Sequence, residues 1–220
     1  MHKLFTSTLL LAGLSTTPLL AQMKGMHSGS MNGAMSTMWG PVVGLNFATF
    51  GGSSASGAGF SSKTGLTVGL ELQRDLAQSL FLRIGALYSM RGADQTNGNA
   101  SLNYIEIPAM LGYTFKMQGS RTRPYVMAGG QFGIKASCSV SGGGSSTDCN
   151  TALGTNVSST DIGVTGGAGV MFPAGRHGHA LVEARYLIGL TNLISSAGAG
   201  NDLKNKGFTV EVGYMMPFGH

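Results

Sequence analysis

The chain has 220 residues, which fits one domain, and only 10% of them are charged. Soluble globular domains carry about 25% charged residues, so the composition argues for an apolar environment instead of a charged, fully hydrated surface. The net charge of +5 is spread too thinly, without a basic cluster, for a nucleic-acid-binding protein. It suits contact with anionic lipid headgroups, and we expect outer-membrane lipids to be partners.

The first 21 residues have the pattern of a cleaved export signal. Lys3 supplies the positive charge, residues 9–14 form the apolar run, and Ala21 precedes the expected cleavage site. This apolar run is too short to cross a bilayer as a helix, and no run of 18 apolar residues follows it. The mature chain is therefore expected to contain no membrane-spanning helix.

Residues 22–39 are rich in Met, Gly and Ser and show no periodicity, which predicts a disordered lead-in. Thioether and imidazole groups in this segment are ligands that suit copper(I), but a disordered linker is the favoured interpretation. The side chains concerned are Met23, Met26, His27, Met31, Met35 and Met38.

Residues 40–218 alternate between apolar and small or polar side chains. In the last segment Phe208 and Val210 fall on one face, and Thr209 and Glu211 fall on the other. Such alternation indicates a strand between two different environments. Pro108 lacks a backbone donor and predicts a bulge in its strand. The alternating segments are 41–50, 66–73, 82–91, 104–115, 125–134, 162–172, 180–188 and 208–218.

The connections alternate in length, which is typical of outer-membrane barrels. We therefore predict an all-β fold: an eight-stranded antiparallel up-and-down transmembrane β-barrel over residues 40–218, with short turns and both termini on the periplasmic side. A soluble, secreted β-sandwich is the alternative. The short turns are expected at 74–79, 116–122 and 173–178, and the long loops at 51–62, 92–101, 138–160 and 191–206.

Aromatic side chains fall near both ends of the predicted strands, as expected for the two interfacial girdles of a membrane barrel. The alternative is that strands are rich in aromatic residues in any protein. The periplasmic set is Trp39, Tyr113, Phe115, Phe172, Tyr214 and Phe218, and the loop-end set is Phe50, Tyr88, Phe132 and Phe208.

The two cysteines, Cys138 and Cys149, flank a Gly/Ser-rich segment. In an exported protein this arrangement predicts one disulfide that closes the loop, with free thiols as the alternative. The spacing differs from the C-x-x-C of catalytic dithiols, so we expect a structural role.

Several charged residues fall on the predicted lumen face. Buried charges are costly unless they are paired, so we expect a plug of ion pairs, with Glu71 facing Arg83 across a hairpin and Arg185 reaching Glu211. The alternative is a narrow polar path or gate. The predicted lumen set is Glu71, Arg83, Glu106, Glu183, Arg185 and Glu211, with Lys135 nearer the loops.

The sequence resembles the porin-like outer-membrane β-barrel domain family over residues 40–218. The resemblance implies a small barrel in the outer membrane of a Gram-negative bacterium, inserted by the barrel assembly machinery, with diverse roles and no functional residue carried by a motif. The family's chains end in Phe, whereas two residues follow Phe218 in this chain. The segments that carry the resemblance are Gly65–Leu72, Leu82–Gly92, Leu102–Phe115, Arg123–Gly130, Leu181–Asn192 and the terminal strand.

No G-x-S-x-G, H-E-x-x-H or P-loop pattern occurs, so we predict a protein that is not an enzyme and has no cofactor or bound metal. His177 and His179 in a short turn are a weak metal signal. We expect a monomer with a structural or surface-interaction role through its long outer loops. The first alternative is a narrow pore or conduit for small or apolar solutes. The second is a lipid-modifying enzyme, which the periplasmic position of the histidines disfavours.

Overall fold

The computed structural model describes residues 35–53, 55, 61–95, 98–142, 145–153, 156–193 and 202–218, which all belong to one compact unit that starts at Met35. The predicted signal peptide and lead-in residues 22–34, with most of the candidate copper ligands, lie outside the described residues. Strand β1 begins at Thr37, so the last three residues of the predicted lead-in belong to the sheet.

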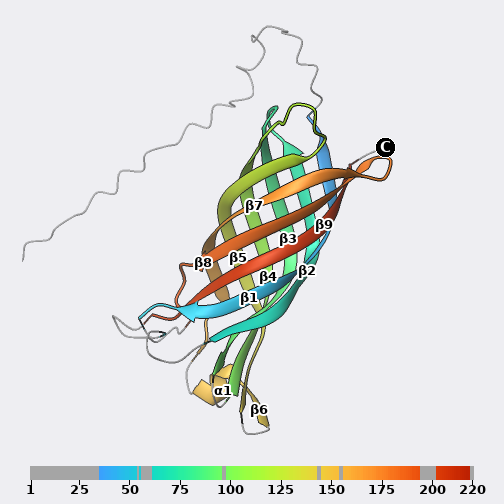
Figure 1. Ribbon diagram of the computed structural model, residues 1–220. Helices are drawn as coiled ribbons and strands as arrows, with labels where there is room; N and C mark the ends of the chain where they lie inside the picture. Colours follow the sequence, from blue (N-terminus) through green and yellow to red (C-terminus); the bar gives the residue numbers. More distant parts are fainter. Residues whose placement is uncertain are drawn as a thin grey trace, which may run out of the picture. The chain divides into compact units, whose positions relative to one another are not determined.

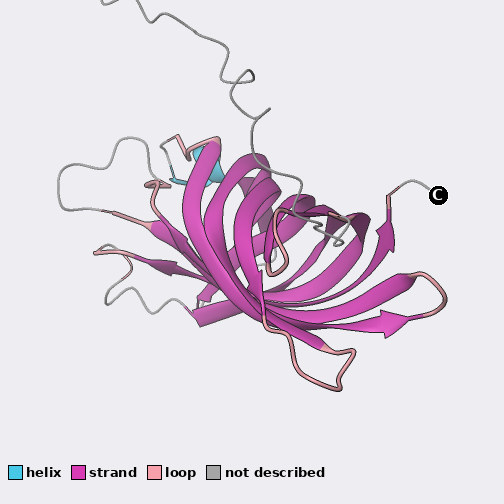
Figure 2. Ribbon diagram, turned by 90° about the horizontal axis from the view of Figure 1, so that it is seen from above, coloured by secondary structure: helices cyan, strands magenta, loops and turns pink. Residues whose placement is uncertain are grey.

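Eight long antiparallel strands follow one another around a closed sheet (Figures 1 and 2). The pairing runs β4-β3-β2-β1-β9-β8-β7-β5, and β4 also pairs with β5, which closes the barrel. The predicted fold class is therefore confirmed. The long strands are β1 (Thr37–Gly51), β2 (Ser61–Asp75), β3 (Leu80–Gln95), β4 (Gly98–Thr114), β5 (Arg123–Gly142), β7 (Thr160–Ala174), β8 (Gly178–Gly189) and β9 (Lys204–Pro217).

Two small elements lie in the connection between β5 and β7: strand β6 (Ser145–Asp148), which pairs only with β5, and helix α1 (Cys149–Leu153). Figure 1 places both at one end of the barrel, opposite the end at which β9 finishes. Within the described ranges, no helix is long and apolar enough to cross a bilayer.

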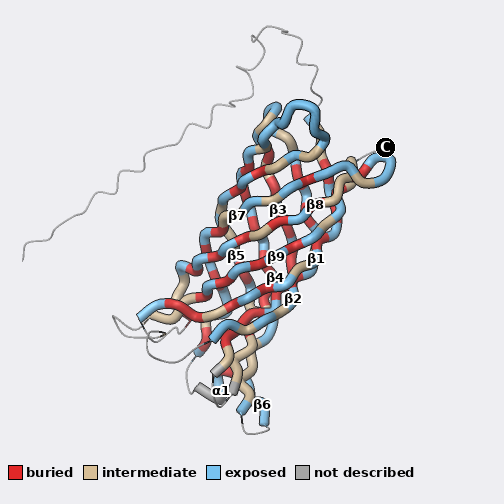
Figure 3. The backbone as a smooth tube through the Cα atoms, viewed as in Figure 1, coloured by how far each residue is buried: buried red, intermediate tan, exposed pale blue. Residues whose placement is uncertain are grey.

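Exposure alternates along every long strand (Figure 3). Leu70 is 52% exposed while the next residue, Glu71, is 2% exposed, and Val212 is 49% exposed beside Glu211 at 1%. Apolar side chains thus cover the outside of the cylinder and charged ones line the inside, the reverse of a soluble domain. An apolar outer surface of this extent is stable in lipid and not in water.

Two of the expected long loops are partly strand. Because β3 continues to Gln95 and β4 starts at Gly98, most of the predicted loop 92–101 is paired sheet. Similarly, β5 extends to Gly142 and pairs with β6. The barrel wall therefore continues at the loop end as a sheet of β3, β4, β5 and β6, which we call the outer extension.

The prediction of a bulge at Pro108 is wrong, because β4 is regular at this residue. The pairs Ile84–Ala109 and Leu87–Glu106 on either side of it keep one register. The register shift in the β4–β5 pairing lies between Asn103 and Tyr104. Pro108 fits a regular strand because glycine stands opposite: a Cβ on Gly85 would lie 3.1 Å from the proline ring.

Glycine also makes room for a large ring in the lumen. A Cβ on Gly112 would lie 2.1 Å from the ring of Phe81, its cross-strand partner, whereas a Cβ on Gly130 would have its nearest neighbour at 4.0 Å. We expect Gly112→Val to lower the free energy of unfolding by about 1–3 kcal/mol and Gly130→Ala to change it little. Urea titration of the heat-modifiable folded band measures both, and equal effects would contradict this packing.

Candidate functional site

The lumen near the short turns is closed by an apolar cluster that contains five methionines. Its members come from seven of the eight long strands, so they meet across the full width of the cylinder. Flexible thioether side chains fill an irregular space of this kind well. The predicted plug of ion pairs therefore does not extend to this end, which apolar side chains fill instead. The cluster, which we call the turn-end plug, is Met38, Phe81, Met110, Tyr125, Met127, Met171, Leu181 and Met215.

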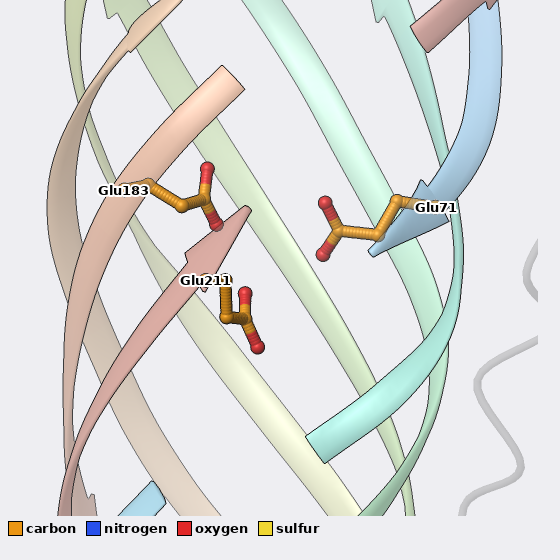
Figure 4. A group of neighbouring side chains, drawn as sticks. All are labelled: Glu71, Glu183 and Glu211. Carbon is orange, nitrogen blue, oxygen red and sulfur yellow. The ribbon is translucent and has the colours of Figure 1, made fainter. Parts of the chain in front are cut away.

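Next to the turn-end plug lies a buried ion cluster centred on Arg185. Its Nη2 atom lies 2.5 Å from Glu71 Oε1 and 3.2 Å from Glu211 Oε2, and it also contacts Glu183 Oε1. Figure 4 shows the three carboxylates pointing toward one another inside the barrel. One oxygen of each carboxylate lies within 4.8 Å of the others, a spacing that a metal ion could bridge, but the guanidinium itself supplies the shared cation.

Arg83 joins this ion cluster to the turn-end plug. Its Nη1 atom donates to Glu183 Oε2 at 2.5 Å and lies 3.7 Å from Glu71 Oε2, while Nη2 donates to Gln73 Oε1 at 2.7 Å. The guanidinium also lies 5.2 Å from the ring centre of Phe81 and 4.9 Å from that of Tyr125, within the range of cation–π attraction. Protein groups thus stabilise this charge from several directions.

A second ion pair lies nearer the loops. Arg91 Nη2 donates to Glu106 Oε2 at 3.0 Å, Arg91 Nε contacts Oε1, and Ser89 Oγ donates to Oε2 at 2.8 Å. Two parallel bonds of this kind form a strong, directional pair. The predicted lumen set contained Glu106 but omitted Arg91, although alternation along β3 places Arg91 on the same face as Arg83.

A small cavity separates the two ion clusters. It is lined by Arg91 and Glu106 of one cluster and by Arg185 and Glu211 of the other. Its volume is about 10 Å³, which is room for roughly one water molecule. The middle of the lumen is therefore polar but nearly full.

The loop end of the lumen is covered by a second apolar cluster: Phe50, Ala93, Leu102, Tyr104, Cys149, Val157 and Leu193. Phe50, expected in the outer aromatic girdle, is only 8% exposed and belongs to this cover. Lys135 donates to the carbonyl of Val157 at 2.7 Å, which holds the segment after α1 against the barrel. We call the seven-residue apolar cluster the loop-end cover.

The disulfide predicted between Cys138 and Cys149 is present, with 5.5 Å between the Cα atoms. It ties the start of α1 to β5 in the outer extension. Because Cys149 belongs to the loop-end cover, the same bond links the outer extension to the closure of the lumen.

All six predicted lumen residues are buried, but the partners differ in part from those expected. Glu71–Arg83 and Arg185–Glu211 approach to 3.7 and 3.2 Å, whereas the shorter contacts join Arg83 to Glu183 and Arg185 to Glu71. Strand alternation shows which residues face the lumen. Which of them meet depends on how strands distant in sequence are staggered around the barrel.

A family model described as "Outer membrane protein beta-barrel domain" matches residues 22–195, more than half of the chain. The chain belongs to this outer-membrane β-barrel family. The membership confirms the resemblance and the location in the outer membrane of Gram-negative bacteria. Strand β9 lies beyond the matched residues, yet it closes the barrel between β1 and β8.

Solved structures of other small barrels resemble the chain. Neisserial surface protein A matches with a TM-score of 0.52 and 17% identity, covering 82% of this chain and 97% of its own. OprG from Pseudomonas aeruginosa matches with a TM-score of 0.50 and 14% identity (85% and 97%). Outer membrane protein W of E. coli matches with a TM-score of 0.50 and 17% identity (86% and 100%). At these identities the likeness shows the fold alone.

No curated protein sequence matches the chain significantly. Membership of the β-barrel family does not by itself decide between a structural, conducting or catalytic role, so the role must be argued from the site. In the part of the chain that the structure describes, the histidines are His177, in the turn between β7 and β8, and His179 at the start of β8. Both lie at the turn end of the barrel.

Proposed function

We propose that this protein is a sealed, non-conducting outer-membrane scaffold that presents the outer extension for contacts at the cell surface. The observation that carries the proposal is the closure of the lumen at successive levels: the turn-end plug, the two ion clusters and the loop-end cover. A lumen filled in this way has no continuous path for solutes. Its side chains instead make the cylinder rigid.

The outer extension has the features of a display surface. Strands β3, β4 and β5 continue past the lipid-facing residues, and β6 adds an edge whose four residues are all exposed. Its side chains are mainly hydroxyl-bearing and small, and the disulfide holds it to the barrel. A rigid, weakly charged surface loses little conformational entropy when it binds a partner.

The narrow pore is the second candidate, and the small cavity between the ion clusters favours it. One water molecule there could become part of a path if the ion pairs rearranged. Planar-bilayer recording separates the two candidates. A sealed scaffold shows no steady openings, whereas reproducible unit conductance of the wild-type protein would support the pore and contradict the scaffold.

The surface role is tested with the double variant Cys138→Ser/Cys149→Ser. We expect the barrel to stay folded, because the disulfide lies in the outer extension, at the loop end of β5. We expect proteinase K to cut within residues 138–160 on intact cells. Attachment of producing cells to glass should fall toward that of cells without the protein. Unchanged attachment after cleavage of the outer extension would count against a surface role.

A further inference from the structure

We propose that the turn end of the barrel carries a ring of cations that binds the anionic headgroups of phospholipids in the periplasmic leaflet. The ring consists of Arg74, Lys116, Arg121, Arg123 and Arg176, and all five residues are exposed. They lie in, or at the strand ends beside, the three short connections that join β2 to β3, β4 to β5 and β7 to β8. We call them the basic ring.

The connections that carry the basic ring lie side by side. Lys116 Nζ donates to Gln78 Oε1 at 3.2 Å, and the backbone of Thr114 bonds to that of Ser79 at 2.7 Å, which joins the first connection to the second. Arg123 pairs with Met171 in the register of β5 and β7, which brings the second connection next to the third. The cations therefore lie together on three neighbouring connections at one end of the cylinder.

The charge of the two ends differs. Among the described residues at the turn end, the five exposed cations of the basic ring are accompanied by one carboxylate, Asp75, which gives a formal charge of +5 − 1 = +4. Asp75 also accepts a hydrogen bond from Ser36 at 2.6 Å. In the described part of the chain, no ring cation forms an ion pair with a carboxylate.

At the loop end, the cations Lys63, Lys135, Lys204 and Lys206 are nearly balanced by Asp94, Asp148 and Asp202, which gives +4 − 3 = +1. Lys204 is paired with Asp202 at 2.7 Å, and Lys135 is bonded to a backbone carbonyl. An excess of charge is therefore specific to the turn end.

The position of the basic ring relative to the lipid face favours a headgroup over a soluble partner. Lys116 directly follows Phe115, which is 46% exposed, and Arg74 follows the outward-facing Leu72, which is 41% exposed, on the same face of β2. Exposed aromatic residues mark the level at which hydrocarbon gives way to headgroups. Cations one or two residues further along the strand lie at the height of lipid phosphates, where each strengthens binding by about 1 kcal/mol, or about fivefold.

The experiment uses detergent-folded, delipidated protein and an equimolar mixture of phosphatidylglycerol and phosphatidylcholine with identical acyl chains. Native mass spectrometry counts the lipids of each kind that are retained. The turn variant carries Arg74→Gln, Arg121→Gln and Arg176→Gln. The matched control removes the same charge at the loop end, through Lys63→Gln, Lys204→Gln and Lys206→Gln.

We expect the wild-type protein and the loop-end control to retain phosphatidylglycerol preferentially. In the turn variant, the ratio of retained phosphatidylglycerol to phosphatidylcholine should fall by about tenfold or more. Adding 0.5 M salt should weaken the preference of the wild-type protein, a test that does not depend on the folding of any variant. Equal retention of both lipids by the wild-type protein would overturn the proposal. So would an equal loss in both variants, or binding to isolated peptidoglycan without any lipid preference.

Discussion

Replacing Arg185 by methionine is expected to lower the free energy of unfolding by about 3–5 kcal/mol, the typical cost of breaking a buried ion pair by removing one partner. The loss is large because one nitrogen of this side chain contacts Glu71, Glu183 and Glu211 together. Methionine fills a similar volume but leaves three buried carboxylates with Arg83 as their only nearby guanidinium. The measurement is urea unfolding in detergent, followed by the fluorescence of Trp39, the single tryptophan, and by loss of the heat-modifiable band.

Glu211→Gln is the matched control for this prediction. The ion cluster centred on Arg185 has three carboxylates and two guanidiniums, so this change removes its excess negative charge. Arg185 stays in contact with Glu71 and Glu183. We expect the free energy of unfolding to stay within about 1 kcal/mol of the wild-type value. If Arg185→Met were equally mild, the lumen would have to be hydrated, and the sealed scaffold would lose its main support.

Replacing Val212 by arginine is expected to lower the free energy of unfolding in lipid bilayers by about 2–4 kcal/mol, the cost of a cation near the middle of the lipid face of a barrel. Val212 is 49% exposed and pairs with Val43 and Val182 in the middle of the sheet. Its outward position means that the cost comes from desolvation of the guanidinium in hydrocarbon, since no protein core is disturbed.

The control for this variant is Leu76→Arg. Leu76 is similarly exposed, at 42%, but follows the end of β2 at the turn, where the expected cost is about 0–1 kcal/mol. Folding into vesicles under a urea gradient measures both. A difference of less than about 1 kcal/mol between the variants would contradict a membrane-embedded lipid face.

The strand alternation determined much of the fold without any tertiary information. Because side chains of a strand point alternately to opposite sides, the sequence around Leu70 and Glu71 shows which residue faces lipid and which faces the lumen. The same argument placed all six predicted charges inside the barrel, where the structure has them buried. It also put Arg91 on the same face as Arg83, although the predicted lumen set did not include Arg91. The eight alternating segments likewise predicted the number of strands, and the alternation of short and long connections predicted how the strands are joined.

Only the tertiary structure decided how the lumen is filled. Arg185 meets Glu71 across 114 residues of sequence, and Arg83 meets Glu183 across 100, because these strands bring residues of equal height together when the sheet closes with a fixed stagger. The turn-end plug has the same origin: methionines on separate strands look unrelated in sequence and converge only in the closed cylinder. Whether a side chain points into the lumen or toward the lipid is a local property of each strand, and the sequence alone predicts it. The level along the barrel axis at which side chains from different strands meet is a property of the closed barrel, and the sequence alone does not predict it.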